Sequence, residues 1–331
     1  GSGDTDGDSI SSGSGSDWIV LNTGSDTVSA GAGNDTLELG AGNNVANLGT
    51  GIDSIIASSG SDSVLGTGDS LGDIYNLGGG ADSVWAGTGA DYIDVSSSSA
   101  DSADYVSAGS GNDTVITGEG DDIVDAGAGL DSISLGAGSD SVLLRVDTLG
   151  VDIVLLGAGR DSIFASADTT GVIVSAAAGD TDGDYFLLGS GNDSIGAARG
   201  NNVVILGTGR DTVSTESGGS GDDSVIAYGI GLSSSGDSTA AADTLGDRYI
   251  LGGGADTVRA GAGNDWIDVS ASSGDSADLV YADSGNDTVI TGDGNDVIFA
   301  GIGIDSILAG SGADSITLSY IASADTVAPD R

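Results

Sequence analysis

The sequence predicts an all-β solenoid, and two observations carry this prediction. First, Gly109 to Leu144 consists of four consecutive nine-residue repeats, GSGNDTVIT, GEGDDIVDA, GAGLDSISL and GAGSDSVLL. Second, each repeat joins a Gly-x-Gly-x-Asp segment, which is typical of a turn, to four residues that alternate with the period of a strand. One turn and one short strand cannot bury an apolar face alone, so the repeats are expected to stack on one another.

The strand half of each repeat supplies the expected core. The aliphatic residues of the four repeats are taken as Val115, Ile123, Ile133 and Val142, one in each repeat, and they should face inward. If two repeats make one coil, then each coil has about 18 residues and two short strands, and turns on the same side recur every 18 residues.

The chain also contains a tandem duplication. The acidic segment GDTDGD at Gly3–Asp8 returns at Gly179–Asp184, and Leu245–Leu318 matches Leu71–Leu144 closely, including its insertion. The predicted organisation is a first solenoid unit at 1–176, a second at 177–318, and a tail or cap at 319–331. Each GDTDGD segment is either a calcium-binding loop or a solvated acidic loop, and the sequence leaves both open.

These repeats resemble the glycine-rich nonapeptide repeats (G-G-x-G-x-D-x-U-x) of the RTX proteins. The resemblance implies a right-handed parallel β-roll with calcium ions bound along its turns. One departure concerns the first Gly of the family pattern, which is replaced here by residues such as Ala108, Ala126 and Leu135. These three residues are expected to face inward and to thicken the core.

The resemblance also implies that the Asp of each turn is a calcium ligand. Calcium prefers six to eight oxygen ligands, and two stacked turns together offer carboxylates and backbone carbonyls. The pairs expected to share calcium are Asp113 with Asp131, Asp122 with Asp140, Asp287 with Asp305, and Asp296 with Asp314. The full set of predicted metal ligands is Asp17, Asp35, Asp53, Asp82, Asp91, Asp113, Asp122, Asp131, Asp140, Asp161, Asp193, Asp211, Asp223, Asp256, Asp265, Asp287, Asp296, Asp305 and Asp314.

Two further hypotheses concern whether calcium ions or hydrogen bonds satisfy the Asp side chains of these turns. In a metal-free ladder, Asp would accept hydrogen bonds from turn N–H groups, although a carboxylate column at about 4.8 Å spacing repels itself strongly. The second hypothesis is that, within residues 13–66, calcium fills sites on one edge of the coil and Asn and Ser hydrogen bonds replace it on the other. The two expected edges are Asp17, Asp35 and Asp53 on one side, and Asp26, Asn44 and Asp62 on the other.

Composition excludes several classes of protein. The 331 residues carry 51 acidic and 7 basic side chains, for a formal net charge of −44. Such a charge argues against nucleic acid and against an anionic membrane as partners. The absence of Cys and His argues against disulfides, zinc sites and thiol chemistry. Without calcium, a chain this acidic and rich in Gly and Ser is expected to be largely unfolded.

The expected function is structural rather than enzymatic, and no catalytic residue is predicted. The favoured hypothesis is a calcium-dependent rod of the bacterial cell surface or extracellular matrix, such as an S-layer, a filament or an adhesin. The alternative is a calcium-triggered secretion and folding module of a larger exported enzyme or toxin. The expected partners are multiple calcium ions, further copies of the chain and a cell-surface polysaccharide. No apolar stretch is long enough to span a membrane, and no signal peptide is visible, so the extracellular location is an expectation from the resemblance.

Overall fold

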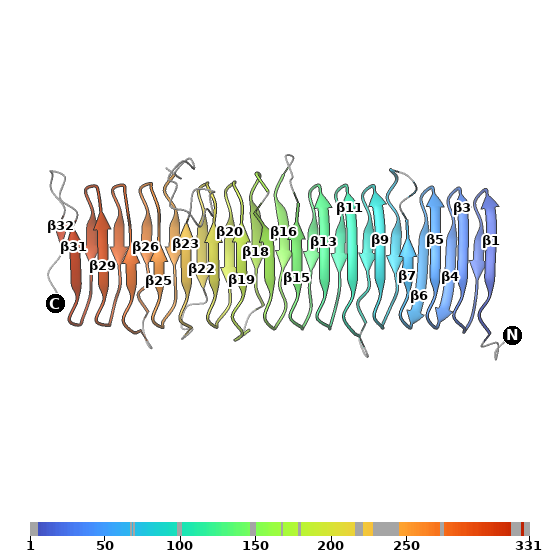
Figure 1. The fold of residues 1–331 in the computed structure, drawn as a ribbon, viewed down its shortest axis with the longest axis horizontal. Helices are drawn as coiled ribbons and strands as arrows, with labels where there is room; N and C mark the ends of the chain where they lie inside the picture. Colours follow the sequence, from blue (N-terminus) through green and yellow to red (C-terminus); the bar gives the residue numbers. More distant parts are fainter. Residues whose placement is uncertain are drawn as a thin grey trace, which may run out of the picture. The chain divides into compact units, whose positions relative to one another are not determined.

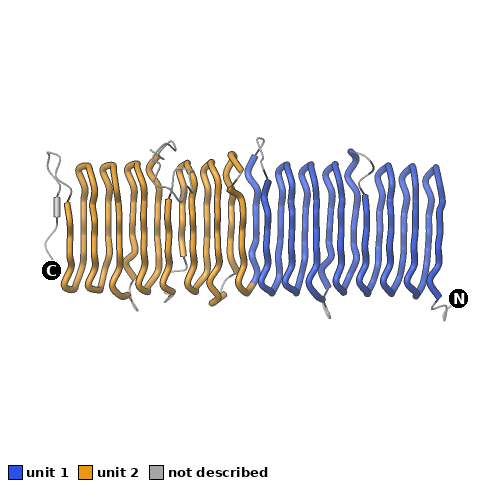
Figure 2. Tube along the Cα trace, viewed as in Figure 1, with its two compact units in different colours: residues 1–157 blue, residues 158–331 orange. Residues whose placement is uncertain are grey.

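The computed structural model describes residues 6–66, 68, 70–97, 101–145, 150–166, 168–177, 180–215, 221–227, 245–271, 275–318 and 326–327. The chain divides into two compact units, Gly1–Gly157 and Ala158–Arg331, coloured separately in Figure 2. The duplication at 1–176 and 177–318 is a feature of sequence similarity and stays a prediction. Of the predicted tail at 319–331, only residues 326–327 are described.

Unit 1 is built from two parallel sheets, whose strands lie side by side in Figure 1. The odd-numbered strands are β1 (Ser9–Ser14), β3 (Thr27–Ala32), β5 (Val45–Thr50), β7 (Ser63–Leu65), β9 (Ser83–Thr88), β11 (Tyr105–Ser110), β13 (Ile123–Ala128) and β15 (Ser141–Leu144). The even-numbered strands are β2 (Trp18–Val20), β4 (Thr36–Ala41), β6 (Ser54–Ser59), β8 (Ile74–Asn76), β10 (Tyr92–Asp94), β12 (Thr114–Ile116), β14 (Ser132–Ser134) and β16 (Asp152–Leu155).

Unit 2 repeats this arrangement. Its odd-numbered strands are β17 (Ser162–Ala165), β19 (Tyr185–Leu188), β21 (Val203–Leu206), β23 (Ser224–Ala227), β25 (Thr257–Arg259), β27 (Leu279–Tyr281), β29 (Val297–Gly301) and β31 (Ser315–Leu318). Its even-numbered strands are β18 (Val172–Ser175), β20 (Ser194–Ala197), β22 (Thr212–Thr215), β24 (Arg248–Ile250), β26 (Trp266–Asp268), β28 (Thr288–Ile290), β30 (Ser306–Leu308) and β32 (Thr326–Val327).

Every coil therefore contributes one strand to each sheet. In the regular part of unit 1, β3 pairs with β5 in parallel so that Thr27 faces Val45, a step of one coil. The predicted all-β parallel solenoid, with about 18 residues and two short strands per coil, is confirmed. The described residues contain no helix of the length and apolar character that a membrane span requires.

The core lies along the inward positions of both sheets. Val115, Ile133 and Val142 are fully buried, as predicted. The assignment of Ile123 to the core is wrong, because Ile123 is 51% exposed and the next residue, Val124, is buried. The turn Asp of GEGDD is Asp122, so Val124 and not Ile123 stands two residues after it, at the position that points inward in the other repeats.

The residues that replace the family's first Gly also face inward. Ala108 and Ala126 are fully buried and Leu135 is 7% exposed, so this prediction is confirmed. The glycines that remain are needed for close stacking. Gly111 has a φ of +139°, and a Cβ built on it would lie 1.6 Å from the carbonyl oxygen of Gly89 in the preceding coil. Side chains are therefore excluded where one turn rests on the next.

Candidate metal centre

Most described turns end in a side chain that bonds to the turn of the preceding coil. At Asp113, the Oδ1 atom accepts a hydrogen bond of 2.9 Å from the backbone N–H of Asp91. The N–H of Asp113 in turn donates to Oδ1 of Asp131, also at 2.9 Å. The carbonyl oxygen of Asp113 accepts from the N–H of Ser132, the first residue of β14. We call each such side chain a rung, because the same bond repeats from coil to coil.

The rungs form two columns in each unit, one before the odd-numbered strands and one before the even-numbered strands. The odd column of unit 1 is Asp8, Asp26, Asn44, Asp62, Asp82, Asp104, Asp122 and Asp140. Its even column is Asp17, Asp35, Asp53, Asp73, Asp91, Asp113, Asp131 and Asp152. The odd column of unit 2 is Asp161, Asp184, Asn202, Asp223, Asp256, Asp278, Asp296 and Asp314. Its even column is Asp193, Asp211, Asp247, Asp265, Asp287 and Asp305.

All nineteen predicted metal ligands lie on these columns. The four expected pairs are adjacent rungs, joined by N–H to Oδ1 bonds of 2.8–3.0 Å in Asp113–Asp131, Asp122–Asp140, Asp287–Asp305 and Asp296–Asp314. The two expected edges of residues 13–66 are also separate columns. Calcium ligation by these residues stays a prediction.

The list of predicted metal ligands leaves out nine carboxylate rungs, of which Asp26 and Asp62 are expected only as part of a stacked edge; the nine are Asp8, Asp26, Asp62, Asp73, Asp104, Asp152, Asp184, Asp247 and Asp278. Most of them lack the complete Gly-x-Gly-x-Asp segment. A different signal would have found many of them, namely an Asp followed two residues later by a buried apolar residue, as in Asp104 and Val106 or Asp184 and Phe186. Asp8 and Asp184, the last residues of the two GDTDGD segments, lie on the columns. Residues 3–5 and 179 of these segments lie outside the described residues.

The second carboxylate oxygen of many rungs has no hydrogen-bond donor. Oδ1 accepts the N–H bond, but Oδ2 is inaccessible to solvent and unpartnered at Asp104, Asp113 and Asp122 in unit 1. The same holds in unit 2 at Asp256, Asp278 and Asp287. A buried ionised oxygen without a partner is strongly unfavourable, so this geometry demands a cation or a proton at each of these six rungs.

The electrostatics of the columns agree with this conclusion. Burial raises the pKa of Asp104 to about 8, and repulsion from Asp122 and Asp82 adds to the rise although the N–H of Asp82 opposes it. Burial likewise raises the pKa of Asp278 to about 8, with Asp256 among the repelling neighbours. Asp104 and Asp278 therefore resist ionisation unless positive charge enters their columns.

The donor set fits calcium. Among the described residues, no three acidic side chains converge closely enough to hold a metal ion by themselves. A site must therefore combine rung carboxylates with backbone carbonyls of the glycine turns, which is the mixture of oxygen ligands that calcium accepts. When bound, calcium would supply the positive charge that the unpartnered Oδ2 atoms lack. The hydrogen bonds of the metal-free ladder are thus present at one oxygen of each rung, while the second oxygen of rungs such as Asp104, Asp113 and Asp122 has no donor.

Two columns carry a tyrosine that bonds to a rung. The hydroxyl of Tyr249 donates to Oδ2 of Asp247 at 2.9 Å, and that of Tyr75 reaches Oδ2 of Asp73 at 3.3 Å. Both tyrosines are fully buried, at the position where other coils place Val or Ile. The repeat pattern in the sequence does not mark either residue.

Comparison with known families agrees with the geometry. A profile of the RTX calcium-binding nonapeptide repeat (4 copies) matches residues 2–37, 11–46, 38–70, 67–97, 101–142, 178–213, 243–273, 250–289, 272–307 and 300–318. The chain belongs to this RTX repeat family. The matches cover well over half of the chain. A search of curated proteins found no match to the chain.

Proposed function

We propose that this RTX protein is a structural rod segment of the bacterial cell surface or extracellular matrix, in an S-layer, a filament or an adhesin, and that its coils fold and stiffen on binding calcium. The observation that carries the proposal is the column of buried Oδ2 atoms without donors. Each column places ionisable oxygens one above another along the stacked coils, so folding requires compensating positive charge.

Linkage explains why folding would respond sharply to calcium. A ligand that binds only the folded chain stabilises it by RT ln(1 + [L]/Kd) at each site, so many weak sites together give a large free energy. The formal charge of −44 opposes the compact state when calcium is absent. Weak oxygen-only sites match the calcium concentrations found outside cells, about 1 mM.

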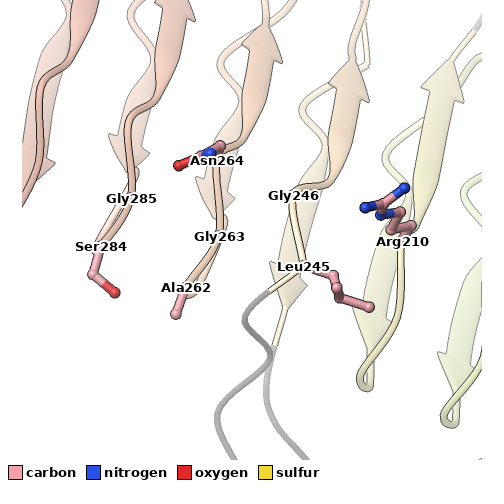
Figure 3. A pocket seen from close by; sticks show the side chains of 8 residues that line it. All are labelled: Arg210, Leu245, Gly246, Ala262, Gly263, Asn264, Ser284 and Gly285. Carbon is pink, nitrogen blue, oxygen red and sulfur yellow. The ribbon is translucent and has the colours of Figure 1, made fainter.

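The same proposal assigns the protein no catalytic activity. The chain has no His and no Cys. An open groove of about 590 Å³ follows the turns of unit 2 and is lined by Gly246, Gly263, Gly285 and Asn264, with Arg210 at one end (Figure 3). Its lining is mostly turn backbone and small side chains, and it includes the hydroxyl of Ser284 but no carboxylate that could act as a base.

A second copy of the chain is the partner that we propose. Outward-facing apolar side chains at Val20, Val45 and Ile56 are about half exposed, and a second copy would remove them from water. Exposed indoles at Trp18, Trp85 and Trp266 support a cell-surface polysaccharide as a second partner.

The test is to follow the whole chain from calcium-free buffer into millimolar calcium. We expect circular dichroism to gain its β signal cooperatively and electron microscopy to show assemblies of the chain in calcium alone. A far-ultraviolet spectrum that does not change on adding or chelating calcium would contradict calcium-dependent folding. Calcium-dependent folding of a strictly monomeric chain would instead favour the secretion and folding module.

A further inference from the structure

Two rungs are amides rather than carboxylates. Asn44 and Asn202 lie on the odd columns of units 1 and 2, and each is 1% exposed. Their Oδ1 atoms make the ordinary rung bond, accepting from the N–H of Asp26 at 3.1 Å and of Asp184 at 3.0 Å. Because the Oδ1 atom must face that N–H donor, the amide NH₂ group must face the other side of the rung.

That other side presents only acceptors. The Nδ2 atom of Asn44 donates to the Gly42 carbonyl and to Oδ1 of Asp62, both at 2.9 Å. The Nδ2 atom of Asn202 donates to Oδ1 of Asp223 at 3.0 Å and to the carbonyls of Gly200 and Ala198 at 3.2 Å. At a carboxylate rung such as Asp122, the corresponding atom is Oδ2, which is buried and has no donor.

The arrangement recurs at positions that the duplication does not relate. When the GDTDGD segments at Gly3–Asp8 and Gly179–Asp184 are aligned, Asn202 corresponds to Asp26 and not to Asn44. Each unit thus has one amide at a different rung, and in both the Nδ2 atom donates to the carbonyl two residues before it and to Oδ1 of the next rung. An amide also carries no charge, so it interrupts the repulsion along its column.

We propose that Asn44 and Asn202 are metal-independent rungs, whose side-chain amides donate the hydrogen bonds that take the place of a calcium ion. Each unit then contains one rung whose side chain is fully hydrogen-bonded without calcium, while the neighbouring carboxylate rungs require calcium. The two residues thereby set how many calcium ions the chain holds. This inference rests on the proposed calcium binding and adds which rungs do not take part.

The test substitutes Asn44→Asp, Asn202→Asp and both together in the full chain. Equilibrium dialysis followed by atomic emission measures calcium bound per chain at saturation, and circular dichroism measures the calcium midpoint of folding. We expect about one additional calcium ion for each substitution and about two for the double variant. The midpoint of folding should move to a higher calcium concentration, because a rung that was hydrogen-bonded without calcium now carries a carboxylate oxygen without a partner.

Asn43→Asp and Asn201→Asp are the matched controls. These exposed residues lie one position before the rungs, and their Oδ1 atoms accept from the N–H of Ser61 and of Asp222 at 2.9 and 3.0 Å. The controls add the same charge beside the column but not on it, so the calcium count should stay at the wild-type value.

The outcomes separate the two proposals. A wild-type chain that binds no calcium would overturn the proposed function and this inference together. A wild-type chain that binds calcium, with an unchanged count in a folded Asn44→Asp variant, would overturn the inference alone. If Asn44→Asp fails to fold, the reverse change Asp122→Asn decides, since it should lose about one calcium ion and keep the fold, whereas an unchanged count would overturn the inference.

Discussion

The two units build the same rungs from different lengths of chain. In unit 1, successive rungs are 18 to 22 residues apart, as in Asp104 to Asp122 and Asp82 to Asp104. In unit 2, 36 residues separate Asp211 from Asp247, and 33 separate Asp223 from Asp256. The N–H to Oδ1 distance nevertheless stays at 2.8 and 2.9 Å across these two long connections.

This difference shows that rung geometry does not depend on the length of chain between rungs. The parallel pairs β22–β24 and β23–β25 keep their register across the long connections. A rung has only two requirements. A carboxylate or amide oxygen must stand directly before a strand, and the first N–H of that strand must bond to the turn of the preceding coil. Extra residues can therefore leave the coil between strands at little cost, because loop closure becomes only slowly less favourable with length.

The largest expected effect is that of pH on the calcium-free chain. Burial raises the pKa of Asp82 and Asp256 to about 7 and that of Asp104 and Asp278 to about 8. An acid whose pKa is raised by folding destabilises the folded state as it ionises, so stability is greatest below the ordinary pKa near 4 and is lost as pH rises to 8. In calcium-free buffer, the β signal should increase from pH 8 to pH 5.

Because these four residues form matched pairs between the units, both units should respond over the same pH range. Hydrogen–deuterium exchange, followed by peptide, distinguishes the units. Protection that returns on acidification in only one unit would show that the columns are not equivalent, and a β signal that is flat with pH would contradict the buried-carboxylate explanation. The chain in saturating calcium is the control and should change little over this range.

A smaller effect is expected from Ala at the stacked glycines. Gly111→Ala and Gly285→Ala would each place a Cβ within 1.6 Å of a carbonyl oxygen in the preceding coil of its own unit, at positive φ. Backbone strain costs about 1–3 kcal/mol, and overpacking adds about 1–3 kcal/mol. Gly15→Ala is the matched control, since φ is +112° but its Cβ would have open space, so only the strain should remain.

Urea denaturation in saturating calcium measures these costs. Equal losses for Gly111→Ala and Gly285→Ala would support equivalent stacking in the two units. A loss for Gly15→Ala as large as that for Gly111→Ala would mean that conformation, and not contact between coils, is the reason for the glycines.

The smallest effect is expected at the buried tyrosines. Tyr249→Phe removes a 2.9 Å hydrogen bond to the Asp247 carboxylate and should cost about 1.5–3 kcal/mol. Tyr75→Phe removes a longer contact of 3.3 Å to Asp73 and should cost less. Denaturation in saturating calcium gives both values, and a larger cost at Tyr75 would contradict the hydrogen-bond explanation.

The sequence by itself determined the coil. The nine-residue period, the alternation after each turn and the Gly-x-Gly-x-Asp segments predicted a parallel solenoid, and they predicted that Asp113 would meet Asp131 and Asp122 would meet Asp140. Local periodicity suffices for this because each coil contacts only its neighbours, so a repeated sequence gives a repeated contact.

Only the tertiary structure decided the full membership of the columns and the state of each rung. Asp73, Asp104 and Asp247 follow irregular segments, where counting residues from one rung to the next fails. They lie on the columns because the pairing of the strands that follow them fixes their position along the solenoid. The difference between the two carboxylate oxygens is likewise a property of two adjacent coils, since Oδ1 accepts a hydrogen bond from an N–H and Oδ2 lacks a donor. No single repeat contains both partners, so no local pattern could reveal it.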